Sequence, residues 1–130
     1  MTVTIITDEK TGQKTAEVVI MRGDSLLPIP FRMTDTDRPT RDFAGTSARW
    51  ALYDRCGTAV DGGTLTVDVA TAGQANVSVA MAKSETAALK PATYNGEIEF
   101  TLSETVDGEP CVLTPFFIRL TIRPDKLTPA

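Results

Sequence analysis

The sequence predicts an all-β protein, an antiparallel β-sandwich of seven or eight strands with one short helical turn. The prediction rests on short segments of alternating apolar and polar residues, on turn-forming residues between them, and on a single tryptophan inside one such segment. In Ser47–Asp54, alternation puts Ala48, Trp50 and Leu52 on one face of a strand. We expect Trp50 at the centre of the core, because an indole dominates the packing of a small domain.

Size and charge fit one soluble domain. The 130 residues contain no apolar run long enough to span a membrane, and the N-terminus shows no secretory signal. The net charge is −4 and the basic residues are scattered, which argues against nucleic acid and anionic lipid as partners. We assign residues 1–14 to an N-terminal arm or first hairpin strand, 15–123 to the sandwich and 124–130 to a C-terminal tail.

The first third of the chain predicts a hairpin or a loose arm followed by an edge strand. Val3–Ile6 and Ala16–Met21 are two apolar runs, and Arg22–Ser25 forms a turn. The next strand, Leu26–Met33, points its odd-numbered residues inward: Leu27, Ile29, Phe31 and Met33. Pro28 and Pro30 lack backbone donors, so this strand must lie at a sheet edge.

The middle of the chain alternates clearly. Residues 34–46 form a polar loop whose Phe43 tucks under the sandwich, and Leu65–Met81 forms an antiparallel hairpin. Its inward residues are Leu65, Val67, Val69, Ala75, Val77, Val79 and Met81. Lys83–Lys90 has helical propensity for one or two turns.

Two strands joined by a turn at Val106–Pro110 complete an immunoglobulin-like sandwich, and Pro115 marks a bulge or an edge. The residues expected inward on these strands are Tyr94, Ile98, Phe100, Leu102, Val112, Phe116, Ile118, Leu120 and Ile122.

The residues offer no catalytic or cofactor-binding set. There is no histidine to act as a base, and adjacent Lys83 and Ser84 point in different directions. Glu97 and Glu99 share a strand face with a spacing close to that of glycosidase carboxylates, but alternation places them on a solvated outer face. We expect no enzyme activity.

Metal and redox sites are also weakly supported. Cys56 and Cys111 are expected to be free thiols, with a disulfide between them as the alternative. Asp35, Asp37 and Asp42 could gather around calcium, but their loop lacks the features of an EF-hand, so we expect no metal. Arg22-Gly23-Asp24 matches an integrin-binding tripeptide and is interpreted as a turn.

Several apolar residues fall outside the buried registers and predict an interface. Val19, Met21, Leu113 and Phe117 lie on the outward register, and Pro28 and Pro30 mark an edge. Alternatively, the four outward residues lie under the N-terminal arm or the loop of residues 34–46.

Three pieces of the chain resemble a known family. They are Arg22–Ile29, the step Phe43-Ala44-Gly45, and Ala72-Gly73-Gln74 followed by Thr86–Tyr94. Their order is similar to that of the N-terminal β-sandwich of bacteriophage baseplate upper proteins and related tail and fibre-associated proteins. The chain departs from the family pattern at Ala92, where glycine is usual, and at Phe43-Ala44, where Leu-Thr is usual.

The resemblance implies a non-enzymatic structural protein of a phage or prophage virion, a tail, baseplate or fibre docking module assembled in the bacterial cytoplasm. The partners would be further copies of the chain, as a dimer or trimer, and other virion proteins. The alternative is a carbohydrate- or cell-surface-binding module on the same fold. Such a module needs a row of exposed aromatic side chains. The sequence shows no such row, because Tyr53 is the only Trp or Tyr residue outside the core register.

Overall fold

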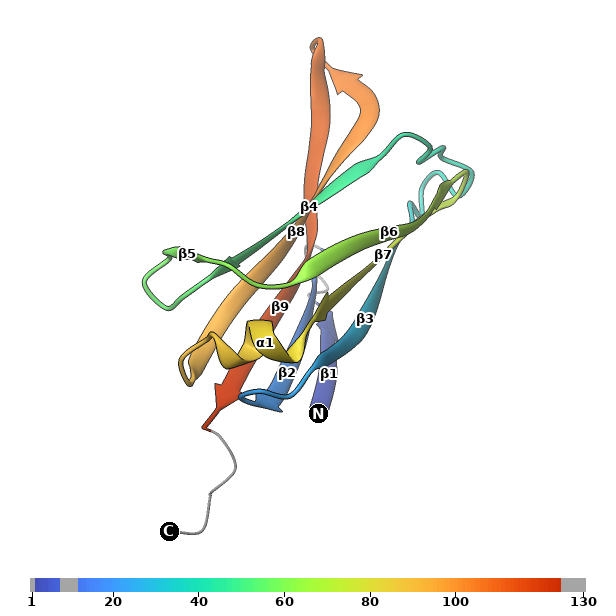
Figure 1. The fold of residues 1–130 in the computed structure, drawn as a ribbon. Helices are drawn as coiled ribbons and strands as arrows, with labels where there is room; N and C mark the ends of the chain where they lie inside the picture. The colour runs from blue at the N-terminus through green and yellow to red at the C-terminus, as the bar shows by residue number, and fades with distance from the viewer. Residues whose placement is uncertain (1, 8–11, 125–130) are drawn as a thin grey trace, which may run out of the picture.

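The computed structural model describes residues 2–7 and 12–124, and this part of the chain forms a β-sandwich with one short helix (Figure 1). The strands are β1 (Thr2–Thr7), β2 (Lys14–Met21), β3 (Leu26–Met33), β4 (Ser47–Tyr53), β5 (Ala59–Val60), β6 (Thr64–Thr71), β7 (Gln74–Met81), β8 (Ala92–Val106) and β9 (Glu109–Arg123). The helix α1 (Lys83–Ala87) follows β7. The predicted all-β sandwich with one helical turn is therefore confirmed, but the described residues form nine strands and not the predicted seven or eight. Residues 125–130 of the predicted C-terminal tail lie outside the described residues.

The strands form a large sheet in the order β1-β2-β9-β8-β4-β5 and a small sheet in the order β3-β7-β6. All pairs are antiparallel except β2 and β9, which run parallel. The prediction of a purely antiparallel sandwich is wrong at this pair. No tight turn joins these two strands, so hairpin geometry does not set their relative direction.

The core lies between the two sheets, where side chains alternate inward along the strands. Ile98 and Phe100 of β8 are fully buried, as are Val77 and Val79 of β7. Phe116 of β9 joins the sheets: its ring stacks on Phe31 of β3 at 5.0 Å and meets Phe100 edge-on at 5.8 Å. The other predicted inward residues that are buried are Ile29, Met33, Leu52, Ala75, Met81, Tyr94, Leu102, Ile118, Leu120 and Ile122.

Trp50 faces inward as predicted but does not occupy the centre of the core. Its side chain is only partly buried and packs against the margin of the core, because only the short β5 lies beyond β4. The indole covers Gly96, where a Cβ atom would overlap the ring, and its Nε1 donates a hydrogen bond to the Gly62 carbonyl at 2.8 Å. Trp50 therefore seals one side of the sandwich, and the phenylalanines fill its centre.

β3 is an edge strand, as its prolines predict, but its first half departs from simple alternation. The register with β7 shifts between Leu26 and Ile29, so Leu26 is buried and Leu27 is 62% exposed. The predicted inward position of Leu27 is wrong, because an irregularity in a strand changes which residues face the core. In β6, Val67 is likewise exposed beside a register shift, whereas Leu65 and Val69 are partly buried.

β8 and β9 continue together beyond the body of the sandwich as a hairpin that projects at one end (Figure 1). The last pairing of β8 with β4 is at Thr101, so the ribbon beyond it consists of β8 and β9 alone. Opposite Glu99 the register shifts by one residue at Thr114-Pro115, which confirms the bulge predicted at Pro115. Past this bulge Val112 pairs with Thr101 and is 51% exposed, so its predicted burial is wrong.

Side chains fix the loop and the helix to the sheets. Phe43 is 2% exposed, which confirms that it tucks under the sandwich. Thr86 of α1 is buried and donates a hydrogen bond to the Asp24 carbonyl at 2.7 Å. The Arg22 Nε donates to the carbonyl of Ala87 at 2.9 Å. The turn at Arg22-Gly23-Asp24 thus holds the helix, and its integrin-like sequence serves a structural contact.

Candidate interaction surfaces

The residues predicted as an interface lie on three separate parts of the molecule. Val19, Met21 and Phe117 are partly exposed on the outer face of the large sheet. Pro28 and Pro30 are exposed on β3 in the small sheet, on the other side of the sandwich. Leu113 pairs with Phe100 and therefore faces the inner side at the base of the projecting hairpin, where it is 36% exposed. These residues do not make one continuous surface.

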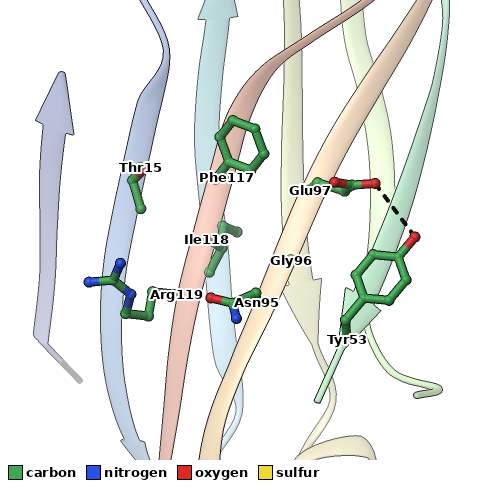
Figure 2. A pocket seen from close by; sticks show the side chains of 8 residues that line it. All are labelled: Thr15, Tyr53, Asn95, Gly96, Glu97, Phe117, Ile118 and Arg119. Atoms are coloured by element: carbon green, nitrogen blue, oxygen red, sulfur yellow. Dashed lines mark hydrogen bonds between the residues drawn. The ribbon is translucent and has the colours of Figure 1, made fainter. Parts of the chain in front are cut away.

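The outer face of the large sheet carries a shallow hollow of about 280 Å³, which the sequence did not indicate as a site (Figure 2). Strand pairing builds it: Phe117 lies beside Glu97 on one row, and Arg119 lies beside Asn95 and Tyr53 on the next. Thr15 of β2 follows Phe117 on the first row. Tyr53 and Phe117 flank the hollow from opposite sides (Figure 2).

Two of the three carboxylates on this outer face pair with arginines across the strands. Arg49 of β4 forms an ion pair with Glu99 at 3.4 Å, and Arg119 of β9 pairs with Glu17 at 2.6 Å. Glu97 receives only a long hydrogen bond of 3.5 Å from the Tyr53 hydroxyl within the described part of the chain. Glu97 and Glu99 thus share the outer face as predicted but differ in their partners.

A second candidate surface is β1 at the open edge of the large sheet. β1 pairs with β2 on one side, and no described strand pairs with its other side. All six of its residues are threonine, valine or isoleucine, and Val3, Ile5 and Ile6 are 38%, 53% and 49% exposed. The prediction left open whether this segment forms a hairpin or an arm, and the structure shows the hairpin. The predicted interface contained no β1 residue, although the uninterrupted run of β-branched residues in this strand favours strand pairing.

A cluster of charges fixes the projecting hairpin to the loop of residues 34–46. The Arg41 guanidinium binds Glu104 in a bidentate manner, with both hydrogen bonds at 2.9 Å, and pairs with Asp35 at 3.1 Å. Arg38 also reaches Glu104, at 3.1 Å. The hydrogen bonds from Arg41 lower the pKa of the Glu104 carboxyl. For Asp35, desolvation raises the pKa, but hydrogen bonds from Arg38, Arg41 and Asp37 outweigh it and the net pKa is lowered.

The aspartates considered above as calcium ligands make local contacts in this loop. Asp35 accepts the backbone N–H groups of Asp37 and Arg38, and Asp42 accepts that of Ala44, so these carboxylates organise turns. No group of His, Cys, Asp and Glu side chains suited to a metal ion occurs in the residues that the structure describes.

Cys56 and Cys111 are both free, so the disulfide alternative is wrong. Lys83 and Ser84 are both exposed on α1, and no hydrogen bond joins them in the described structure. No helix among the described residues is long and apolar enough to cross a membrane.

Comparison with known proteins assigns the chain to no family. No protein-family model and no curated protein matches the chain. Among solved structures, a family 123 glycoside hydrolase from Clostridium perfringens, which acts on glycolipid glycans, aligns with 88% of this chain at 14% sequence identity and a TM-score of 0.49. The alignment spans only 23% of that enzyme.

Proposed function

We propose that the chain is a non-enzymatic docking module of a phage or prophage virion, joining tail, baseplate or fibre components. Its partners are further copies of itself and neighbouring virion proteins. The observation that carries the docking part of the proposal is the open edge at β1. The virion part follows from the resemblance to the sandwich of baseplate upper proteins.

The composition of β1 supports docking by strand addition. An edge strand exposes unpaired N–H and C=O groups, and soluble proteins usually block such edges with charges, prolines or bulges. β1 has no charged residue and no proline, and its register with β2 is continuous from Thr2 to Thr7. A strand from another subunit can therefore add to it in full register.

The turn before β8 supports the family resemblance. Tyr94 is buried, and its hydroxyl donates a hydrogen bond to the Lys90 carbonyl at 2.8 Å. Leu89 of the same turn is 5% exposed and belongs to the core. The segment Leu89–Tyr94 that carries the resemblance thus has a defined structural role, a tyrosine that closes its own turn.

The second candidate, a carbohydrate- or cell-surface-binding module, is favoured by one observation. Tyr53 and Phe117 both flank the hollow on the outer face of the large sheet, so that face has two aromatic side chains around polar groups.

The proposal is tested by measuring the mass of the purified chain by light scattering over a range of concentrations. We expect concentration-dependent dimers or trimers that the substitution Ile5→Lys converts to monomers, because a charge on the edge strand disfavours pairing. Leu27→Lys is the matched control, since Leu27 is also exposed but lies on β3. A monomer at all concentrations that also binds no product of neighbouring virion genes would overturn the proposal.

A further inference from the structure

We propose that the hollow on the outer face of the large sheet binds the guanidinium group of an arginine side chain from a partner protein, with Glu97 as its counter-ion. The inference rests on the docking function for the partner's identity. The hollow is lined by Tyr53, Asn95, Glu97, Phe117 and Arg119, together with Thr15 and the backbone around Gly96 and Ile118.

Glu97 is the carboxylate on the outer face that has no ion pair among the described residues. Glu17, Glu97 and Glu99 carry negative charge on this face, and Arg123 carries positive charge at the end of β9 opposite Met21. Arg49 and Arg119, which lie on the rows next to Glu97, also carry positive charge. Both arginines already hold other carboxylates, Glu99 and Glu17 respectively. Figure 2 shows the Arg119 side chain extending toward β2, away from Glu97. Glu97 is left without an ion pair among the described residues, and it lies at the edge of the hollow.

The rings of Tyr53 and Phe117 leave room for a planar group between them. Tyr53 is on β4 and Phe117 on β9, with β8 between them and an offset of one row along the strands, so they stand roughly 12 Å apart. This width admits one flat group lying over β8 beside Glu97. A planar guanidinium stacks on aromatic rings and donates two parallel hydrogen bonds to a carboxylate, whereas an ammonium group does neither as well.

Glu97 makes one weak hydrogen bond within the described part of the chain. The Tyr53 hydroxyl lies 3.5 Å from its Oε1, which is longer than the usual range of about 2.5–3.0 Å for such a bond. This weak contact leaves Oε2 without a partner among the described residues. The group is therefore positioned for a ligand but not neutralised by the protein's own side chains.

Nuclear magnetic resonance tests the inference. N-acetyl-L-arginine amide, a monocation, would be titrated into ¹⁵N-labelled protein through the millimolar range expected for a single side chain. We expect the backbone signals of Asn95, Gly96, Glu97 and Phe117 to shift together with one dissociation constant. The corresponding lysine amide should bind more weakly, and a neutral monosaccharide should leave these signals in place.

Two variants make the result decisive. Glu97→Gln should weaken binding of the arginine probe by about fivefold or more, and Tyr53→Leu by about threefold. Glu109→Gln, which removes the same charge from the tip of the hairpin, should leave the affinity unchanged. The inference is overturned if the probe shifts no signal in the hollow, if Glu97→Gln binds it equally well, if lysine binds as tightly as arginine, or if only the sugar binds. Since none of these variants alters β1, the light-scattering result on self-association is independent of this outcome.

Discussion

β1 and β3 are both edge strands, yet their sequences prepare them for opposite roles. β3 is anchored by Ile29, Phe31 and Met33, which are all buried, and its exposed side carries Pro28 and Pro30. In β1 every residue from Val3 to Thr7 is exposed, and nothing in its sequence hinders pairing. The difference teaches that edge position alone does not define an interface. We expect β3 to contribute stability and resist association, and β1 to contribute little stability and provide the docking edge that we propose.

The largest expected effect is on stability through β3. Phe31→Ala removes a ring that is 4% exposed and stacks on Phe116, so it should lower the free energy of unfolding by about 3–5 kcal/mol. Urea unfolding followed by Trp50 fluorescence measures this change. Ile5→Ala in β1 is the control and should cost less than about 1 kcal/mol. Equal losses for the two variants would contradict the assignment of stability to β3.

A smaller loss is expected where Trp50 covers the large sheet. Gly96→Ala places a methyl group against the indole, which must move away from β8, and should cost about 1–3 kcal/mol. The same unfolding assay applies, and the emission maximum of Trp50 should shift to the red as the ring becomes more exposed. An unchanged midpoint and emission maximum would show that the indole does not cover Gly96 in solution.

The charge cluster at Arg41 should make the projecting hairpin sensitive to acid. The lowered pKa values of Asp35 and Glu104 mean that their ion pairs stabilise the fold above the unfolded pKa of about 4. This stabilisation is lost as the pH falls through the lower pKa values of the folded state. Arg41→Met should therefore lower the unfolding midpoint at pH 7 but have almost no effect near pH 2. A difference that persists at low pH would assign the effect of Arg41 to its contact with the Phe43 ring, 5.7 Å from the guanidinium.

The smallest expected effect comes from unblocking β3. Pro30→Thr restores a backbone donor at an exposed position opposite Ser78 and should change stability by no more than about 0.5 kcal/mol. In a chain that also carries Ile5→Lys, which blocks β1, Pro30→Thr should allow weak association of two chains through β3. Sedimentation velocity of the double variant measures this association, and complete absence would mean that the prolines are not what blocks β3.

Alternation in the sequence predicted the faces of regular strands well. In β7 every expected inward residue is buried, and in β8 the same holds for Tyr94, Ile98, Phe100 and Leu102. The errors at Leu27 and Val112 both lie beside register shifts. A single extra residue reverses the face of all residues beyond it, and only Pro115 hinted at such a position in the sequence.

The sequence predicted the candidate surfaces less well than it predicted the faces of the strands. The sequence placed Glu97 and Glu99 on one outer face, but it contained no sign that Arg49 pairs with Glu99 and leaves Glu97 unneutralised. That distinction depends on which strands are neighbours in the sheet. β9 pairs with both β8 and β2, and the pairing with β2 brings together Glu17 and Arg119, which are about a hundred residues apart in the sequence. The openness of the β1 edge likewise depends on the order of strands in the sheet.

Hydrogen exchange of the β1 amides at low and high protein concentration tests the central claim most directly. An open edge strand leaves alternate N–H groups unpaired in the monomer, and these groups become hydrogen-bonded when a second strand adds. The account predicts that amides within Thr2–Thr7 exchange quickly in dilute solution and become protected as the concentration rises, while those of β3 do not change. Equal exchange of β1 at all concentrations, or protection that appears at β3 instead, would contradict the claim that β1 is the docking edge.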